Sequence, residues 1–436
     1  MHRLPLADQL PYQFFPPRAV PFWLWVGRFY WTNILLKREQ NVQEVEFQGL
    51  EHLSKCVRQG DGVLITPNHP DHADGAVLFE LGHTLRLPFY YMTAYQVLLT
   101  NGPLARALLP RIGAFPVDRE GSDLRAFKTG VEILSAGKNP LVVFPEGEVY
   151  RVCDRLTPIR EGAAALAVSS AKRLNETGKT CWIVPTAIKY RFIDGFDPMP
   201  ALRQSIASLE ARFTWWEKTE GSLVERIYLF AEGLLALKEL EYFGEAHKGP
   251  LKPRIAELRD SILDQMEDRR IGKRRAETVP VRVKELRKAC LDRLADPAVS
   301  VEDGNLLRRD LHDLFVVIQL FSYPGDYVRE RPTVDRVAET LLKFEEDLVG
   351  YEAAKPVGPR RVVLRLGEAI DVGKYLATTG KKGASAALTA EMEAKIQGLL
   401  DEIGPGRPLE GLSPDPEKML APRLALSNGS PGGFGS

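Results

Sequence analysis

A histidine and an aspartate with four residues between them are the strongest chemical signal in this chain. His69 and Asp74 follow the apolar run 62–66, which predicts a buried strand. An α/β sheet presents its reactive groups outside the carboxyl ends of its strands, and Pro70 suits the first turn of a helix that begins there. Asp74 can then bond one imidazole nitrogen of His69 while the other accepts a proton, as in the His–Asp half of a catalytic triad.

No activated serine or cysteine accompanies this pair. The motif blocks of the chain contain no Gly-x-Ser-x-Gly turn. The cysteines show no pairing pattern; they are Cys56, Cys153, Cys181 and Cys290. We therefore expect the attacking nucleophile to be part of a substrate.

Two other interpretations of these residues stay open. The pair can form a structural hydrogen bond only. Alternatively, a metal-dependent hydrolase could use the cluster of His69, Asp71, His72 and Asp74, because histidine and carboxylate ligands suit zinc or iron. The spacing of the cluster matches none of the common metal motifs, and no histidine-rich segment follows it. We therefore expect no bound metal.

The composition is that of an ordinary globular protein. Of the 436 residues, 44% are hydrophobic and 27% are charged, which is enough for a large core. Lysine plus arginine equals aspartate plus glutamate at 58 each, so no basic excess argues for nucleic acid as a partner. Scattered cysteines and a start without an apolar leader predict a cytoplasmic location.

No apolar run reaches the length needed to span a bilayer. The nearest run, residues 19–36, is interrupted by Arg28 and followed by Lys37 and Arg38. Its clusters of Trp, Phe and Tyr suit a helix that lies in the lipid headgroup layer. A buried aromatic helix packed on the domain fits the same pattern, because periodicity cannot separate the two. We expect residues 1–42 to form an N-terminal helical segment, either at the membrane interface or packed on the domain.

Short β-rich runs alternate with helical stretches from residue 43 to residue 202. This alternation predicts an α/β core with a mostly parallel central sheet flanked by helices. The expected strands are 44–49, 62–67, 89–93, 114–118, 141–145 and 182–189, and the expected helices are 75–81, 123–136 and 160–174.

The pattern changes beyond this core. Residues 203–355 are charged and carry apolar positions at helical spacing, which predicts about five helices with solvated charged faces. Strand character returns at 361–372 and is followed by a helix at 389–403. Residues 356–403 thus close the core, and the bundle is an insertion into it.

The chain ends in a segment of different composition. Residues 404–436 are rich in Pro, Gly and Ser. Such a composition cannot bury enough apolar surface to fold, so we expect a disordered tail.

Three further blocks stand at the ends of expected strands. Arg119 ends the strand at 114–118, and a guanidinium group matches phosphate geometry; a surface ion pair is the plainer interpretation. The second block is Phe144-Pro145-Glu146-Gly147, where the glycine permits close backbone approach to a ligand. The third is Pro185 within an apolar strand, which is unusual unless the missing donor faces a bulge or a ligand edge.

The four blocks in this order resemble the glycerolipid acyltransferase superfamily, which includes lysophosphatidic acid and glycerol-3-phosphate acyltransferases. The resemblance covers roughly residues 20–200 and 360–403. It implies that His69 and Asp74 are catalytic and that Arg119 contacts a phosphate. It also places Phe144, Pro145, Glu146, Gly147 and Pro185 among the substrate-binding residues.

One departure from the family pattern concerns the third block. Glu148 stands where the family usually has Thr or Ser, and the arginine that commonly follows directly is found only at Arg151. An added carboxylate would repel an anionic head group.

The resemblance implies acyl transfer to a hydroxyl of a lysophospholipid-type acceptor in phospholipid synthesis. The donor is acyl-coenzyme A or acyl carrier protein, with no other cofactor. His69 acts as general base, Asp74 orients it, and no covalent intermediate forms. The resemblance also favours peripheral attachment to the membrane surface through residues 19–36. A non-catalytic lipid-binding protein is the remaining alternative.

Overall fold

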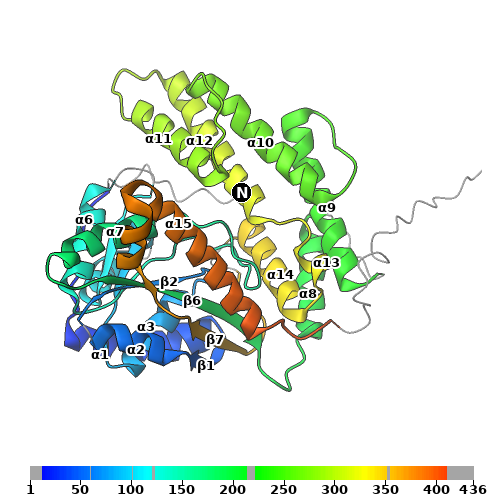
Figure 1. Ribbon diagram of the computed structural model, residues 1–436. Coiled ribbons are helices and arrows are strands. Elements are labelled where there is room, and N and C mark those ends of the chain that lie inside the picture. The colour runs from blue at the N-terminus through cyan, green and yellow to red at the C-terminus, as the bar shows by residue number, and fades with distance from the viewer. Residues whose placement is uncertain are drawn as a thin grey trace, which may run out of the picture.

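The computed structural model describes residues 12–58, 60–100, 102–119, 123–213, 221–350 and 354–409. These residues form one mixed sheet with helices on both faces, beside a bundle of helices (Figure 1). The strands are β1 Val42–Gln48, β2 Gly62–Pro67, β3 Tyr90–Ala94, β4 Ala114–Val117, β5 Leu141–Val142, β6 Cys181–Phe192, β7 Arg360–Leu366 and β8 Ile370–Asp371.

Helices make up most of the rest. In the core they are α1 Pro21–Phe29, the π-helical η1 Tyr30–Glu39, α2 Leu50–Arg58, α3 Asp74–Thr84, α4 Tyr95–Thr100, α5 Gly102–Leu108, the 3₁₀ turn η2 Leu109–Arg111, α6 Leu124–Ala136, α7 Gly162–Asn175 and α15 Val372–Ile403. Between β6 and β7 they are α8 Met199–Phe213, α9 Leu223–Phe243, α10 Leu251–Arg270, α11 Val279–Leu294, α12 Val301–Ser322, α13 Tyr327–Glu330 and α14 Val334–Leu348.

The sheet confirms the α/β fold with a mostly parallel centre. Its strand order is β1-β7-β6-β2-β5-β3-β4, with β8 also paired to β6. The five strands from β6 to β4 are mutually parallel, whereas β7 and β8 run antiparallel to β6. Every residue of β2 is buried, as expected for a strand covered by helices on both faces. The carboxyl ends of the parallel strands therefore meet at one edge.

Apolar side chains fix the helices on the two faces of the sheet. One cluster joins Val63 and Ile65 of β2 to α3 and to the partly buried tryptophans of the α1–η1 segment. The other joins Leu64 of β2 to α6, α7 and α15. Figure 1 shows α1, α2 and α3 on one side of the sheet and α6, α7 and α15 on the opposite side. The small residues at 162–167 bring α7 close to the sheet, because their side chains occupy little space.

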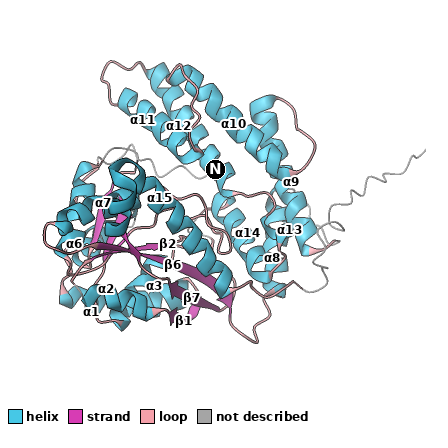
Figure 2. Ribbon diagram, in the orientation of Figure 1, coloured by secondary structure: helices cyan, strands magenta, loops and turns pink. Residues whose placement is uncertain are grey.

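The described residues between β6 and β7 form helices joined by loops (Figure 2). They have their own hydrophobic core, in which α8, α9, α10, α11, α12 and α14 pack together. The sequence predicted about five helices here, and the structure has these six long helices and the single turn α13. Helix α8 begins at Met199, before the predicted start of the insertion at residue 203.

Several element boundaries differ from the sequence-based expectation. Helix α15 begins at Val372 and includes the expected helix 389–403 as its second half. Asp371 caps its first turn by accepting from the amide of Gly373 at 2.9 Å, so the helix follows β8 directly. Helices α2, α4 and α5 were not predicted, because each is short and lacks a long apolar period.

The segment after α15 packs on the bundle as far as the structure describes it. The amide of Leu409 donates to the carbonyl of Pro332, and the amide of Val334 donates to the carbonyl of Arg407. Leu409 is buried. The rest of the expected disordered tail, 410–436, lies outside the described residues.

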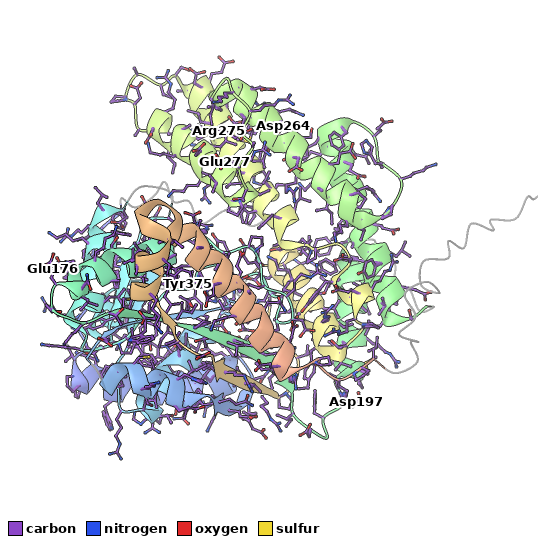
Figure 3. All side chains as sticks on the ribbon, in the orientation of Figure 1. Glu176, Asp197, Asp264, Arg275, Glu277 and Tyr375 are labelled. Atoms are coloured by element: carbon purple, nitrogen blue, oxygen red, sulfur yellow. The ribbon has the colours of Figure 1, made fainter. Side chains whose placement is uncertain are left out.

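Charged side chains cover the outer surface. Figure 3 shows Glu176 at the end of α7 and Asp197 before α8 on the periphery, with Asp264, Arg275 and Glu277 in the part of the bundle away from the sheet. One of them, Asp264 of α10, lies 2.6 Å from the buried Arg282 of α11. Among the described residues, no helix combines the length and the apolar character needed to cross a bilayer.

Candidate active site

Hydrogen bonds of Asn68 and Asp71 fix the loop that joins β2 to α3. The side-chain amide of Asn68 donates to the carbonyl of Ile188 at 3.0 Å, and its oxygen accepts from the amide of the same residue at 2.7 Å. Asp71 accepts from the amide of Ala73 at 2.9 Å and so closes a turn just before α3. The loop between Asn68 and Asp74 is therefore held in one conformation at the carboxyl end of β2.

The structure brings His69 and Asp74 into direct contact. Nδ1 of His69 lies 2.7 Å from Oδ2 of Asp74, and the other carboxylate oxygen accepts from the hydroxyl of Tyr190 at 2.7 Å. Asp74 is fully buried. Burial raises the pKa of its carboxyl, and the bonds from His69 and Tyr190 act against that rise.

The imidazole of His69 faces a cavity. Its ring stacks on Phe144, with 3.9 Å between the ring centroids and 21° between the planes. The side chain is 20% exposed, and no described residue bonds Nε2. This geometry can transfer a proton: the carboxylate fixes the ring, and Nε2 is accessible to a group that binds in the cavity.

The cavity lies between the α/β core and the inserted bundle and measures about 2060 Å³. Pockets for small ligands usually measure about 300–1,000 Å³, so this one can take more than a single compact molecule. Its wall is mostly apolar. It is formed by α1, η1 and α3 of the core, by the loops after β4 and β5, and by α9, α12 and α14 of the bundle.

Arg119 stands at a polar part of this wall, together with Glu148. Its guanidinium group lies 2.9 Å from Oε1 of Glu148 and donates to the carbonyl of Gly147. Although burial disfavours the charged carboxylate, Arg119 and then Arg160 hold the pKa of Glu148 below its ordinary value. The ion pair expected as the plainer interpretation of Arg119 is thus present, inside the cavity.

The block 144–147 supplies part of the wall around His69. Phe144, Pro145 and Gly147 line the cavity. Gly147 has φ +81, and a Cβ atom there would lie 2.9 Å from the guanidinium of Arg160. Only glycine therefore fits this turn without strain.

Glu146 is buried behind that wall. Its two oxygens accept from the amides of His69 at 2.6 Å and Thr157 at 3.0 Å, and it is 4% exposed. The carboxylate therefore binds the backbone amide of His69 and does not form part of the cavity wall. Burial raises its pKa to about 7, against the effect of these bonds.

Pro185 lies inside the sheet, away from the cavity wall. It pairs with Thr66 in the register of β2 and β6, and its carbonyl accepts from the amide of Gly367 at 2.8 Å. Because the nitrogen and carbonyl of one strand residue point to the same side, its missing donor faces the link between β7 and β8. The link between β7 and β8 is thus the sheet edge that faces the nitrogen of Pro185.

A buried ionic network joins the His69 loop to the bundle. Arg151 lies 2.7 Å from Asp71 and 2.9 Å from Glu346 of α14. Nε2 of His72 lies 2.8 Å from the second oxygen of Glu346, and Arg360 of β7 lies 2.8 Å from Asp71. Despite burial, Arg360 and Arg151 hold the pKa of Asp71 below its usual value.

The four residues that the sequence suggested as metal ligands take part in two separate sets of contacts. His69 and Asp74 bond each other, while Asp71 and His72 take part in the network with Arg151 and Glu346. In the described part of the chain, no group of three or more His, Cys, Asp or Glu side chains is arranged to hold a metal ion.

Tyr190, Arg151 and Glu346 were not assigned a role from the sequence. Arg151 left a weak signal, because it is the displaced arginine of the third block and has a positive φ of 56°. A positive φ in a non-glycine residue marks a backbone held by its surroundings. Tyr190 and Glu346 leave no local signal, since they approach the loop only through the tertiary fold.

A comparison with known protein families matches the segment of the chain that contains these residues. The family model described as Acyltransferase matches residues 44–189, which contain His69, Asp74, Arg119, the block 144–147 and Pro185. The match supports acyl transfer as the activity of this domain. The inserted bundle and the closing strands lie outside it. Residues 44–189 therefore form an acyltransferase domain that is similar to the glycerolipid acyltransferases.

Proposed function

We propose that this protein transfers a fatty acyl group from a thioester to a hydroxyl of a lysophospholipid-type acceptor in phospholipid synthesis. The observation that carries the proposal is the contact of 2.7 Å between His69 and Asp74 at the wall of an apolar cavity. The acyl-transferring family supplies the reaction class. The donor is acyl-coenzyme A or acyl carrier protein, and the reaction consumes no cofactor.

His69 is the general base of the proposed reaction. Its Nε2 takes the proton of the acceptor hydroxyl while the oxygen attacks the thioester carbonyl carbon. The tetrahedral intermediate collapses, the carbon–sulfur bond breaks, and the imidazolium returns the proton to the leaving thiolate. General-base assistance of this kind contributes about 10²- to 10⁴-fold. Asp74 stabilises the imidazolium, and Tyr190 fixes Asp74.

Other groups of the cavity have supporting roles in this proposal. Arg119 approaches the phosphate of the acceptor, and Phe144, Pro145 and Gly147 form the wall against which it binds. Glu146 acts indirectly, through the backbone of His69. The acyl chains lie along the apolar wall, where burial of each methylene contributes about 0.8 kcal/mol.

The lipid substrates also suggest where the protein operates. The face of α1 and η1 that carries Phe22, Trp25, Phe29 and Tyr30 is exposed, by 46% to 70%. Trp23 and Trp31 of the same segment line the cavity. We propose that this aromatic face lies in the headgroup layer of a membrane, which would let a lipid enter the cavity from the bilayer.

The experiment is acyl transfer from labelled acyl-coenzyme A to a set of lysophospholipids, with products identified by mass spectrometry. His69→Ala should lower the rate at least about 10²-fold while circular dichroism remains native. His83→Ala, an exposed histidine at the end of α3, is the matched control and should retain full activity. Wild-type protein that binds lysolipid without any transfer would instead favour the lipid-binding alternative.

A further inference from the structure

Glu148 is an acidic group in direct contact with the arginine expected to hold the acceptor's phosphate. Both residues line the cavity, and 2.9 Å separates Oε1 of Glu148 from the guanidinium of Arg119. The side chains are only 31% and 22% exposed. The carbonyl of Gly147, next to Glu148 in the chain, accepts from the same guanidinium. The guanidinium group of Arg119 therefore already contacts two groups of the protein before any substrate binds.

The surroundings of Glu148 keep its charge in place. Arg119 follows β4, Arg160 precedes α7, and Arg287 lies on α11; all three favour the ionised carboxylate against the effect of burial. The pKa of Glu148 is consequently below its ordinary value, so the carboxylate is charged at neutral pH and in mild acid. A ligand that enters this part of the cavity meets a permanent negative charge.

Two hydrogen-bond donors near Glu148 remain available to a ligand. The hydroxyl of Tyr150 and Nε of Arg160 are buried and have no hydrogen-bond partner among the residues that the structure describes. Both residues line the cavity, and Tyr150 is 3% exposed. Buried donors are normally paired, so oxygen atoms of a substrate are their natural partners. The polar wall thus suits an oxygen-rich group of limited charge.

We propose that Glu148 is a specificity-determining residue that makes this enzyme prefer phosphodiester acceptors over phosphate monoesters. The inference rests on the proposed function and names its substrate class. Glu148 offsets the charge of Arg119, so this part of the wall suits the single charge of a phosphodiester better than the higher charge of a monoester. A monoester carries up to two charges at neutral pH, and repulsion by Glu148 grows in proportion to that charge. Tyr150 and Arg160 supply the donors for the phosphodiester oxygens.

The test compares two acceptors that share one acyl chain: a lysophosphatidic acid, which is a monoester, and a lysophosphatidylglycerol, which is a phosphodiester. With full-length protein and one acyl-coenzyme A, kcat/KM is measured for each. The wild type should favour the phosphodiester. Glu148→Gln should raise the monoester-to-phosphodiester ratio about tenfold, equivalent to about 1.4 kcal/mol. Glu44→Gln, which breaks a 2.7 Å pair with Arg361 away from the cavity, should leave the ratio unchanged.

The pH dependence of the ratio provides a readout that a merely structural role would not change. The second ionisation of a phosphate monoester occurs near about pH 6, so discrimination by the wild type should weaken when the pH is lowered from about 7.5 to about 5.5. Glu148→Gln should flatten this dependence. The ratio cancels any common effect of His69 on the rate.

The outcomes separate this inference from the function on which it rests. Equal or better use of the monoester by the wild type, or an unchanged ratio in Glu148→Gln, overturns the inference while acyl transfer itself stands. Absence of transfer to both acceptors by folded wild-type protein overturns the proposed function and this inference with it.

Discussion

At the scale of single residues, Glu146 links the acid–base chemistry of the site to the stability of the fold. Its carboxylate accepts from the backbone of His69 and Thr157, yet burial raises its pKa to about 7. The group therefore changes its protonation state near neutral pH, directly beside the proposed general base. Such a change in proton affinity must appear in the pH dependence of stability.

We expect Glu146 to make the folded protein less stable as pH rises. The folded state binds this proton more tightly than the unfolded state, whose pKa is near 4.5, so stability falls between about pH 4.5 and pH 7. The loss should be roughly 2–3 kcal/mol, because each tenfold change in proton affinity corresponds to about 1.36 kcal/mol. Denaturant unfolding at about pH 5 and about pH 8 measures it, and Glu146→Gln, which cannot ionise, should reduce the difference.

Glu339 is an internal control for this comparison. Burial also raises its pKa to about 7, but it titrates equally in the wild type and in Glu146→Gln. A variant with the same pH-dependent loss as the wild type would show that Glu146 does not titrate in this range.

At the scale of elements, α14 of the bundle is joined to the loop that carries His69. Glu346 contacts both His72 and Arg151, at 2.8 Å and 2.9 Å, and Arg151 contacts Asp71 at 2.7 Å. His72 and Arg151 hold the pKa of Glu346 at about 2 despite burial. The bundle is therefore connected to the proposed catalytic loop by charged groups that are costly to separate.

Glu346→Gln should lower activity and stability together. Removing one member of a buried ionic network destabilises by about 3–5 kcal/mol, and the 16% exposure of Glu346 reduces our expectation to about 2–3 kcal/mol. Displacement of the loop should lower kcat about tenfold, because small misplacements of catalytic groups have large effects. Steady-state kinetics below the unfolding temperature, with melting curves, provide the measurement.

Glu345→Gln is the matched control on the same helix. Glu345 accepts from Ser205 of α8, so it acts within the bundle and not at the loop. Equal kcat values for the two folded variants would contradict a positioning role for Glu346.

Helix α1 provides a second prediction at this scale. Trp25 and Phe29 are 70% and 68% exposed, and each would bury apolar surface in a lipid headgroup layer. Replacing both with serine should weaken liposome binding at least about tenfold, since burial of a large apolar side chain contributes about 1.5–3 kcal/mol. Vesicle co-sedimentation is the measurement.

Leu229→Ser tests whether any exposed apolar residue has this effect. Leu229 is 45% exposed on α9, in the inserted bundle, and its replacement should leave vesicle binding intact. Binding of the Trp25/Phe29 double variant at the wild-type level would remove α1 as the membrane-facing element.

At the scale of the whole molecule, the α/β core and the bundle together form the wall of the cavity. Its 2060 Å³ are bounded by His69 and Phe144 on one side and by α9, α12 and α14 on the other. The bundle lies outside the segment matched by the acyltransferase family. The inserted helices therefore add an apolar wall that the matched core does not contain.

We expect Ala231 of α9 to influence acyl-chain length. Its small side chain lines the cavity, so Ala231→Phe should reduce the space available to a long chain. The kcat/KM for long-chain acyl-coenzyme A should fall about tenfold relative to short-chain donors, because overpacking costs about 1–3 kcal/mol. A series of donors of increasing chain length measures this ratio.

Leu237→Phe adds similar bulk to the same helix outside the cavity. Leu237 is 61% exposed and does not line the cavity wall, so chain-length preference should remain that of the wild type. If Ala231→Phe lowered kcat/KM by the same factor with every donor, this position would not determine the preference for chain length.

The sequence by itself determined the features that depend on residues close in the chain. The alternation of apolar runs and helical periods predicted the parallel sheet, and β2 was predicted at the bounds that the structure shows. The five-residue spacing of His69 and Asp74 predicted their contact, because a loop that leads directly into a helix start brings the two side chains within reach. These are local consequences of backbone geometry, so no knowledge of the packing is needed to derive them.

Only the tertiary structure decided which distant groups surround this pair. Tyr190 is 116 residues from Asp74, and Glu346 is 274 residues from His72, so no spacing in the sequence relates them. The structure likewise directed Glu146 to the backbone of His69 and placed Pro185 inside the sheet, although both sit in recognisable blocks. Packing of the sheet and the bundle sets these contacts, because burial and charge pairing act between neighbours in space and not along the chain.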